Sequence, residues 1–421
     1  MKLMVIGGGG REHAVCKKLA ESKLVTELLC APGNAGIASV ARCVPGVKAT
    51  DIEAIVALAK EEKVDFVCVT PDDPLALGCV DALEKEGIAA FGPSAYAAQM
   101  ESSKIFSKNL MKKYGIPTAA SETFEDMDAA LAYLDTQTAP IVIKADGLAL
   151  GKGVIVAATM DEAKQAVVDM MAGGRFGKSG ARVLIEECMF GREVTVLCFC
   201  DGKTIVPMRA SQDHKRAFDH DEGPNTGGMG AFAPSPLYTA EIAERTMNEI
   251  LVPTLNAMNA EGFTFKGVLY VGLMLTKDGP KVVEYNARFG DPETQVVLPL
   301  LDSDLMEIMM AVREQKLAEL DIKWKSESAA CVVLASGGYP NKYESGKVIT
   351  GLDEAEAVEA TVYHAGTKMA DGEFVTAGGR VLGVTALGVD LRAAVTRAYG
   401  AAKLIKFDQM HMRTDIGSKD M

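Results

Sequence analysis

Lys281-Val-Val-Glu-Tyr-Asn-Ala-Arg-Phe-Gly-Asp-Pro-Glu293 is the stretch of sequence around which the rest of the chain is organised. Its valines and tyrosine are typical of a β-strand, in which successive side chains point to opposite faces. One predicted face is polar and contains Glu284, Asn286 and Arg288. The other predicted face packs on a core and contains Val283, Tyr285 and Ala287.

The polar face of this predicted strand is rich in groups that bind metal ions and phosphates. The Glu284 carboxylate and the Asn286 carboxamide lie two residues apart, and their oxygens suit a hard cation such as Mg²⁺. Arg288 follows on the same face, and its planar guanidinium can hold phosphate or carboxylate oxygens. Asp291 and Pro292 then predict a helix start, with Asp291 as N-cap, which would add backbone donors beside the site. The alternative is an edge strand with a solvated face.

Composition bounds the class of protein. The chain has 421 residues, of which 48% are hydrophobic, so two to four domains with sizeable cores are expected. Its net charge is −13, which argues against a general basic surface for nucleic acid. No apolar run reaches the roughly 18 residues of a membrane span, and residues 2–6 lead into glycines rather than a cleavage site. We therefore expect neither a membrane segment nor a signal peptide.

The nine cysteines predict a reducing compartment. Their number is odd, no C-x-x-C occurs, and most lie in apolar runs. Buried free thiols and a cytoplasmic location are therefore favoured. The five histidines do not pair with cysteines at ligand spacing, which argues against zinc.

The N-terminus predicts a strand, a glycine turn and a helix. Residues 2–6 are strand-like, four glycines follow at 7–10, and an amphipathic helix extends from Arg11 to about residue 24. This order forms an anion site at a helix N-terminus. It is not the dinucleotide fingerprint, because Glu12 occupies the third glycine position. The alternative is a tight turn with no ligand.

Further strands alternate with helices up to about residue 102. They are predicted over 27–31, 65–69 and 88–91, and this alternation indicates a parallel, doubly wound sheet. Ligands bind such sheets beyond the carboxyl ends of the strands. Three loops should converge there, over 7–12, 32–36 and 70–74.

Two lysines flank a glycine-rich loop in the next region. A helix is predicted over 104–114, and a strand over 139–144 presents Lys144. The loop 145–153 lacks the spacing of a phosphate-binding P-loop, and a strand follows it. We predict a mobile flap whose amides and Lys152 close over phosphates, the alternative being a plain flexible hairpin. The loop 173–179 is a similar near miss.

Two later loops carry dense functional groups. A strand is predicted over 183–189, and it leads toward Glu193. Its apolar residues are followed by Glu186 and Glu187, which suit the rim of a nucleotide pocket or, equally, an ordinary strand end. The loops 211–216 and 223–230 are predicted to form no regular element, as in functional loops or linkers. The other predicted elements are a hairpin over 194–208, a helix over 239–259, a strand over 267–275 that pairs with 281–288, a helical region over 295–319, a polar boundary at 321–328, strands near 329–335, 358–364 and 379–387, and a helix over 390–404.

Six motifs resemble the phosphoribosylamine–glycine ligase family, and the resemblance extends from residue 2 to about 405. They are Gly-Gly-Arg-Glu-His at 9–13, Ala-Pro-Gly-Asn-Ala-Gly at 31–36, Ile-Lys-Ala-Asp-Gly-Leu-Ala at 143–149, Ser-Gln-Asp-His-Lys-Arg at 211–216, Gly-Pro-Asn-Thr-Gly-Gly-Met-Gly at 223–230 and Asn-Ala-Arg-Phe-Gly-Asp-Pro-Glu at 286–293. The family is similar to the wider ATP-grasp superfamily. The resemblance implies an α/β and α+β multidomain fold: a Rossmann-like domain over 1–102, an ATP-grasp domain over 103–325 with a lid at about 118–188, and a small α/β cap over 326–421.

The resemblance also implies a reaction. ATP and Mg²⁺ or Mn²⁺ would convert glycine to glycyl phosphate, and 5-phosphoribosylamine would then be acylated in a step of purine synthesis. The implied ATP contacts are Lys104, Lys144, Gly147, Gly151, Lys152, Gly153, Glu186, Glu187 and Glu193. The implied substrate contacts are Gly9, Gly10, Arg11, Asn34, Asp72, Asn225, Thr226, Gly228 and Asp291. The implied catalytic residues are Arg288, Asp213 and Lys215, and the implied metal ligands are Glu284 and Asn286.

The sequence departs from the family pattern at two places. Asp72, in Thr-Pro-Asp-Asp-Pro-Leu at 70–75, replaces the family glutamate, and the strand 267–274 offers no metal carboxylate. The expected partners are the two small substrates, with no nucleic acid and no membrane, in a monomer or weak homodimer. Alternatives are another ATP-grasp ligase or carboxylase that acts on a phosphoribosyl substrate, and a regulatory nucleotide-binding module.

Overall fold

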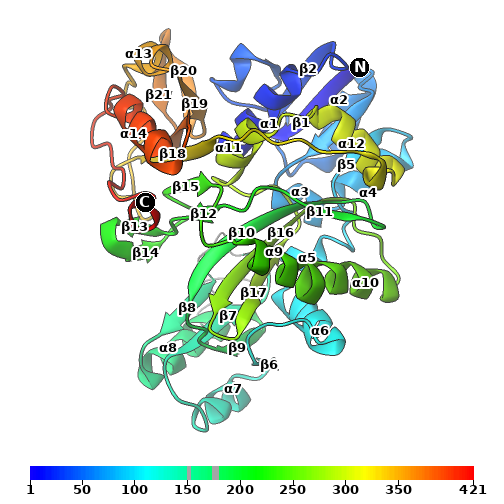
Figure 1. Cartoon of the computed structure of the whole chain (residues 1–421), viewed down its shortest axis with the longest axis vertical. Helices are drawn as coiled ribbons and strands as arrows, with labels where there is room; N and C mark the ends of the chain where they lie inside the picture. The colour runs from blue at the N-terminus through cyan, green and yellow to red at the C-terminus, as the bar shows by residue number, and fades with distance from the viewer. Residues whose placement is uncertain (149–152, 173–179) are drawn as a thin grey trace.

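The computed structural model describes residues 1–148, 153–172 and 180–421. It contains an N-terminal parallel sheet, a central pair of antiparallel sheets and a C-terminal sheet (Figure 1). The predictions for Gly151, Lys152 and the loop 173–179 lie outside the described residues. Within the described ranges, no helix is both long and apolar enough to cross a membrane.

The N-terminal sheet confirms the predicted parallel, doubly wound fold. Its strand order is β3-β2-β1-β4-β5, and every pairing is parallel. Met4 and Ile6 pack on one side, whereas Leu3 and Val5 pack on the other, so both faces of β1 are covered. The strands are β1 Lys2–Gly7, β2 Glu27–Pro32, β3 Arg42–Cys43, β4 Phe66–Val69 and β5 Ala89–Phe91. The helices are α1 Gly10–Ala20, α2 Ile52–Glu61, α3 Asp72–Ala76 and α4 Cys79–Lys85, so α1 ends before the predicted residue 24.

A four-stranded sheet in the order β6-β9-β7-β8 has a core of its own. Its strands are β6 Ser121–Phe124, β7 Ile141–Ala145, β8 Val154–Ala157 and β9 Val183–Glu187. Helices α7 Met127–Leu134 and α8 Met160–Met171 pack on it, and both lie in the lower part of Figure 1. Helices α5 Gln99–Ser102 and α6 Lys104–Tyr114 connect it to the N-terminal sheet.

The other central sheet has the order β11-β10-β16-β17. Its edge strand β17 contains the first part of the stretch Lys281–Glu293. Its strands are β10 Arg192–Cys200, β11 Ile205–Pro207, β16 Gly267–Thr276 and β17 Gly279–Asn286. A register shift lies opposite Gly272 and Leu273, which pair with Glu284 and Val282, so Val283 is an extra residue. The prediction that Val283 packs on the core is therefore wrong: Val282 is fully buried instead.

The helix start predicted at Asp291 is also wrong. Residues 291–293 form a turn, and the short helix α11 spans Thr294–Val297 with Glu293 as its N-cap and no side-chain cap bond. The Asp291 carboxylate is committed elsewhere, because it accepts a hydrogen bond from Gln295 Nε2 at 2.7 Å. The predicted set of free backbone N–H donors at a helix start capped by Asp291 is therefore absent from residues 291–293.

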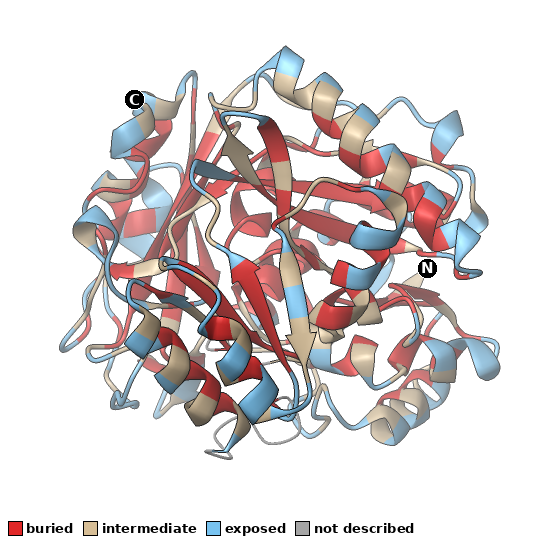
Figure 2. Cartoon of the chain, turned by 90° about the horizontal axis from the view of Figure 1, so that it is seen from below, coloured by how far each residue is buried: buried red, intermediate tan, exposed pale blue. Residues whose placement is uncertain are grey.

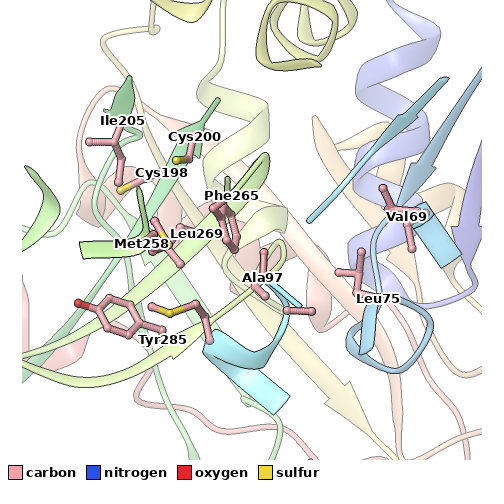
Figure 3. Close-up of a cluster of buried hydrophobic side chains, with 14 of the residues drawn as sticks. Val69, Leu75, Ala97, Cys198, Cys200, Ile205, Met258, Phe265, Leu269 and Tyr285 are labelled. Carbon is pink, nitrogen blue, oxygen red and sulfur yellow. The ribbon is translucent and has the colours of Figure 1, made fainter. Parts of the chain in front are cut away.

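The core beneath β17 joins this sheet to its helices. Tyr285 lies among Met258, Phe265 and Cys198 (Figure 3), and its hydroxyl contacts that of Thr254 at 2.6 Å. The helix predicted over 239–259 is present in three segments, α9 Ala240–Thr246, a π-helical turn Met247–Leu251 and α10 Val252–Ala260. Figure 2 shows the buried strands inside and the exposed outer faces of the surrounding helices.

The C-terminal sheet recruits strands from the loops 211–230. Its order is β12-β15-β18-β22-β19, and the prediction that these loops form no regular element is wrong in part. The strands of this sheet are β12 Gln212–Asp213, β15 Gly230–Ala233, β18 Ser328–Ala335, β19 Ala360–His364 and β22 Arg380–Gly388. Two separate hairpins lie beside it: β13 Arg216–Phe218 pairs with β14 Glu222–Asn225, and β20 Thr367–Ala370 pairs with β21 Glu373–Thr376. Helices α13 Leu352–Ala357 and α14 Leu391–Ala402 complete this part.

The region 295–319 is helical but broken. It contains α11, a 3₁₀ turn Leu298–Leu300, α12 Leu305–Glu314 and a second 3₁₀ turn Leu317–Glu319. Pro299 lacks a backbone donor, and the Asp304 carboxylate caps a new helix by accepting from Met306 N at 2.8 Å. These two residues account for the interruption.

Candidate functional site

A cavity of about 970 Å³ lies where the central sheets meet the N-terminal and C-terminal sheets. Its lining brings together most of the residues predicted to bind substrates. From the predicted set, the cavity is lined by Arg11, Asp72, Lys104, Lys144, Gly147, Gly153, Glu186, Glu187, Glu193, Asp213, Lys215, Asn225, Thr226, Glu284, Asn286, Arg288 and Asp291.

A buried cluster of lysines and a glutamate forms one part of the lining. Lys144 Nζ and Lys108 Nζ lie 2.8 Å and 3.0 Å from the two carboxylate oxygens of Glu186. Burial alone would raise the pKa of Glu186, but the two ammonium groups hold this pKa below its ordinary value. Lys108 was not predicted, although it lies four residues after Lys104 on α6 and therefore shares its face.

Lys104, the first residue of α6, lies beside this cluster of lysines. Its Nζ donates to the Gly147 carbonyl at 2.8 Å, and Gly147 has a φ of +123°, which favours glycine. Burial lowers the pKa of Lys104, although nearby Glu284 acts in the opposite direction. Lys144 Nζ also donates to the Val283 carbonyl at 3.2 Å, so the bulge in β17 points a backbone oxygen at the cluster.

Glu284 and Asn286 fit a divalent cation. Both line the cavity, and neither side chain makes a hydrogen bond to a described residue, so their oxygens are available. The nearest cation to Glu284 is Lys215 Nζ, at 3.9 Å. In the described ranges no group of three or more histidine, cysteine or acidic side chains forms a closed metal site. An open pair of this kind suits Mg²⁺, which completes its coordination with water and substrate phosphates.

Arg288 is fixed by a residue that sequence reasoning missed. Its Nη2 lies 2.9 Å from Glu101 Oε1, while the other Glu101 oxygen accepts from Ala287 N at 2.8 Å. Burial opposes the charge of Arg288, but Glu101 and Asp72 raise the arginine pKa above its ordinary value. The buried Nε of Arg288 has no partner among the described residues, which leaves one donor for a ligand.

Asp213 is the last residue of β12, and Lys215 lies in the short connection from β12 to β13. Lys215 Nζ lies 3.3 Å from Glu193 Oε2. Burial raises the pKa of Asp213 to about 7, Lys215 opposes this rise, and Glu293 and Glu193 add to it. A carboxyl group of this kind can exchange a proton near neutral pH.

The glycine-rich loop 223–230 is held from the C-terminal sheet. Thr226 N donates to the Lys215 carbonyl at 2.7 Å, which ties the two motif loops together. Arg380 Nη1 donates to the Gly227 and Asp291 carbonyls at 2.7 Å and 2.9 Å, and Arg380 Nη2 pairs with the Asp291 carboxylate at 2.9 Å. Arg380 was missed, because nothing near it in sequence marks it as functional.

Three predicted glycines serve the backbone rather than line the cavity. Gly228 has a φ of +114°, and a Cβ there would lie 2.4 Å from Pro292 Cδ. Gly9 donates its N–H to Glu12 Oε2 at 2.6 Å, and Gly10 begins α1. Arg11 is held by the same glutamate, with its Nε 2.6 Å from Glu12 Oε1.

Asn34 is not brought into the cavity. Its Nδ2 donates to the Gly8 carbonyl at 3.0 Å and to the His364 carbonyl at 2.7 Å. Its Oδ1 accepts from Gly36 N and Ile37 N, both at 2.9 Å. The side chain therefore links the N-terminal loop to the C-terminal sheet.

Solved structures define the class of this fold. The biotin carboxylase domain of the Hydrogenobacter thermophilus 2-oxoglutarate carboxylase superposes with a TM-score of 0.72 at 16% identity, covering 98% of this chain and 91% of that one. Phosphoribosylamine–glycine ligase from Thermotoga maritima superposes with a TM-score of 0.85 at 32% identity, covering 99% and 100%. The chain thus has an ATP-grasp fold, as predicted.

Family models and relatives narrow the class. Three parts of phosphoribosylglycinamide synthetase match: the N domain at residues 1–101, the ATP-grasp (A) domain at 102–294 and the C domain at 329–419. Phosphoribosylamine–glycine ligases of Vibrio vulnificus (strain YJ016) and Escherichia coli (strain K12) are 49% and 50% identical over 419 and 422 residues, covering 99% of this chain and 98% of each relative. The chain belongs to the phosphoribosylglycinamide synthetase family.

Proposed function

We propose that this chain joins glycine to 5-phosphoribosylamine with ATP, giving N1-(5-phosphoribosyl)glycinamide, ADP and phosphate. Family membership supports the reaction. The observation that carries it is that buried lysines, the open oxygen pair of Glu284 and Asn286, Arg288 and the two motif loops all line the same cavity of about 970 Å³. A carboxylate is a poor electrophile, and this set supplies what its activation by ATP requires.

The first step transfers the γ-phosphoryl group of ATP to a carboxylate oxygen of glycine. The bond between the γ-phosphorus and the ADP oxygen breaks as the new P–O bond forms. Lys104 and Lys144 hold the α- and β-phosphates, and Glu284 and Asn286 would hold Mg²⁺ or Mn²⁺, which neutralises phosphate charge. Arg288, fixed by Glu101, stabilises charge on the transferring group, because phosphoryl transfer depends on positioning and charge neutralisation.

The second step forms the C–N bond. The amine of phosphoribosylamine attacks the carbonyl carbon of glycyl phosphate, phosphate leaves, and the nitrogen loses a proton. Asp213 accepts this proton, directly or through water, which agrees with its pKa of about 7. Water has to be kept from the site during this step, because it would otherwise hydrolyse the acyl phosphate.

The remaining assignments follow the same reasoning. We assign Glu186, Glu187, Glu193, Gly147 and Gly153 to the nucleotide rim, and Arg11 to the ribose phosphate. Asp72, Asn225, Thr226 and Asp291 shape the substrate site directly, whereas Gly9, Gly10, Gly228 and Asn34 support it by holding the surrounding backbone. Gly151 and Lys152 keep their expected ATP contacts but lie outside the described residues. Divisions near residues 102 and 325, a cytoplasmic location and a monomer or weak homodimer complete the proposal.

The test is ADP release by the purified chain with Mg-ATP. Phosphoribosylamine is formed in place from ribose 5-phosphate and ammonia, with glycine present or omitted. The proposal predicts glycine-dependent ADP release matched by phosphoribosylglycinamide. Release that ignores glycine, or that responds to bicarbonate or another acid, would contradict it and would favour a different ATP-grasp reaction.

A further inference from the structure

Residues 411–421 form a tail that crosses from the C-terminal sheet to the central sheet β11-β10-β16-β17, and in Figure 1 the C-terminus lies beside β13. At the start of the tail, His411 exchanges two backbone hydrogen bonds with Ala335 of β18, both of 2.8 Å. Near its end, the Asp420 carboxylate accepts from Nη2 of Arg192 in β10 at 2.8 Å, and the Asp420 side chain is only 4% exposed. Asp420 also lines the cavity of about 970 Å³. The tail therefore extends from the C-terminal sheet to the wall of the candidate active site.

Arg413 is the centre of the tail's contacts. Its side chain is fully buried, and its Nε and Nη2 donate to the two carboxylate oxygens of Asp415, both at 2.8 Å. Its Nη1 donates to Asp221 Oδ1 at 2.9 Å and to the Arg216 carbonyl at 3.1 Å, and both of these residues line the cavity. Burial alone would raise the pKa of Asp415, but its hydrogen bonds with Arg413 hold this pKa below its ordinary value. One buried guanidinium thus joins the tail to the β13–β14 hairpin.

The turn of the β13–β14 hairpin has a backbone conformation that needs support. His220 and Asp221 have φ values of +62° and +59°, in the left-handed region that residues other than glycine rarely adopt. His220 N donates to Asp415 Oδ2 at 2.8 Å. The preceding Asp219 accepts from Thr414 N at 2.7 Å and from the Thr414 hydroxyl. Contacts from the tail therefore hold each residue of a strained turn.

The hairpin leads directly into the glycine-rich loop 223–230. Asn225 is the last residue of β14 and Thr226 follows it, and both line the cavity. Asp221, at the other end of β14, also accepts from Lys419 Nζ at 2.6 Å, so the tail holds the turn through a second cation. The position of the turn therefore affects where the cavity-facing end of β14 lies.

We propose that the tail 411–421 is a positioning element of the candidate active site, and that Arg413 is its central positioning residue. The tail fixes the turn of the β13–β14 hairpin and thereby the place of Asn225 and Thr226. Those two residues are assigned above to the substrate site, so the inference rests on the proposed function.

The tail acts through the hairpin rather than on a substrate. Neither Arg413 nor Asp219 is among the described residues that line the cavity. A misplaced hairpin weakens the binding of glycine or phosphoribosylamine. Lys104 and Lys144, which are assigned to ATP, stand on α6 and β7 instead, so we expect the binding of ATP to be spared.

The first test changes a residue outside the cavity lining. Asp219→Ala removes both acceptors of Thr414, and we expect the KM for glycine or for phosphoribosylamine to rise about fivefold, with the Kd for ATP unchanged. Asp219→Asn retains an oxygen that can accept from Thr414 N and should recover most of this loss. Asp408→Ala, which removes an exposed carboxylate paired with Lys347, is the matched control and should have wild-type kinetics. Wild-type KM values in Asp219→Ala, or an equal loss of ATP affinity, would overturn the proposal.

The second test follows the hairpin itself. Hydrogen exchange of the full chain is measured by mass spectrometry for the wild type, Arg413→Met, Asp219→Ala and Asp408→Ala. Peptides that cover residues 214–226 should exchange at least about tenfold faster in the Arg413 and Asp219 variants, whereas peptides of the N-terminal sheet should not change. Unchanged exchange at 214–226, or exchange that rises equally throughout the chain, would overturn the proposal.

Hydrogen exchange also separates this inference from the proposed reaction. It needs no turnover, so it decides the role of the tail even if the wild type shows no glycine-dependent ADP release. If Arg413→Met does not fold, the comparison of Asp219→Ala with Asp219→Asn and Asp408→Ala decides instead, because Asp219 is a less buried partner of the tail.

Discussion

Two parts of the main cavity are built differently. The lysine cluster, formed by Lys104, Lys108, Lys144 and Glu186, stands on α6, β7 and β9, which are regular elements. The acceptor loops, at 211–230 and 287–293, are short strands and turns tied together by Arg380 from the C-terminal sheet. On the proposed site assignment, we therefore expect nucleotide binding to depend on local packing and acceptor binding to depend on how the C-terminal sheet docks.

The largest expected effect is on turnover, from Arg288 in the acceptor loop 287–293. Arg288→Ala should lower kcat by about 10²–10³-fold, because it removes charge stabilisation from the transferring phosphoryl group. ATP affinity, measured by equilibrium binding, should change only a few-fold. Arg245→Ala, which removes a surface arginine paired with Glu249, is the control and should leave both unchanged. Equal losses of turnover and ATP affinity would refute the transition-state role.

The next effect tests the lysine cluster through stability. Glu186→Gln leaves Lys108 and Lys144 buried without their carboxylate, which should lower the free energy of unfolding by about 3 kcal/mol. Thermal and denaturant unfolding measure this change. Glu187→Gln alters the exposed neighbour and should cost much less. A similar small loss in both variants would show that the cluster does not stabilise the folded chain.

The third prediction concerns the acceptor loops, whose substrate binding should weaken when Arg380 is removed, while ATP binding should not. Arg380→Ala removes several hydrogen bonds to Gly227 and Asp291 and should raise the KM for phosphoribosylamine or glycine about 30-fold, equivalent to about 2 kcal/mol. The Kd for ATP should be unaffected. Arg392→Ala on the exposed face of α14 is the control. Loss of ATP affinity in the Arg380 variant would remove the distinction between the two parts.

The pH dependence of the turnover rate tests whether Asp213 accepts the proton. Its pKa is raised to about 7, so the carboxylate required to accept a proton is lost as the pH falls through that value. With saturating ATP, the turnover rate should fall about tenfold between about pH 8 and about pH 6. Asp213→Asn should lower the rate and abolish this dependence. An unchanged profile in the variant would assign the titration to another group.

The smallest expected effect concerns Asp72, where the family pattern has glutamate. Asp72 lines the cavity from the start of α3, so Asp72→Glu lengthens a side chain that already faces the ligand space. We expect less than about a threefold change in any KM, equivalent to less than 1 kcal/mol. Steady-state kinetics decide this. A change greater than tenfold would show that carboxylate position at Asp72 is decisive.

The features that could be predicted from the sequence are those set by regular elements or by contiguous motifs. The parallel N-terminal sheet follows from strand–helix alternation, and Glu284 and Asn286 follow from alternation along one strand. Arg288 lines the cavity as predicted, although it lies beyond the end of that strand at Asn286. The bulge at Val283 was not predictable, because it depends on the register with β16. The same alternation rule, applied across the bulge, therefore placed the wrong valine in the core.

Residues that act from another element were missed. Glu101 holds Arg288 across 187 positions, and Arg380 holds Asp291 across 89. Neither belongs to a motif, and only the docking of separate elements brings them to the site. Asn34, by contrast, belongs to a motif but links two elements outside the cavity.

The most direct test of the account is the fate of oxygen from glycine. Glycine labelled with ¹⁸O in its carboxylate is turned over with Mg-ATP and phosphoribosylamine, and the inorganic phosphate is analysed by mass. If the carboxylate attacks the γ-phosphoryl group and the amine then displaces phosphate, each turnover transfers one ¹⁸O to phosphate. Unlabelled phosphate, formed at the same rate as phosphoribosylglycinamide, would contradict glycyl phosphate formation and the role given to Arg288.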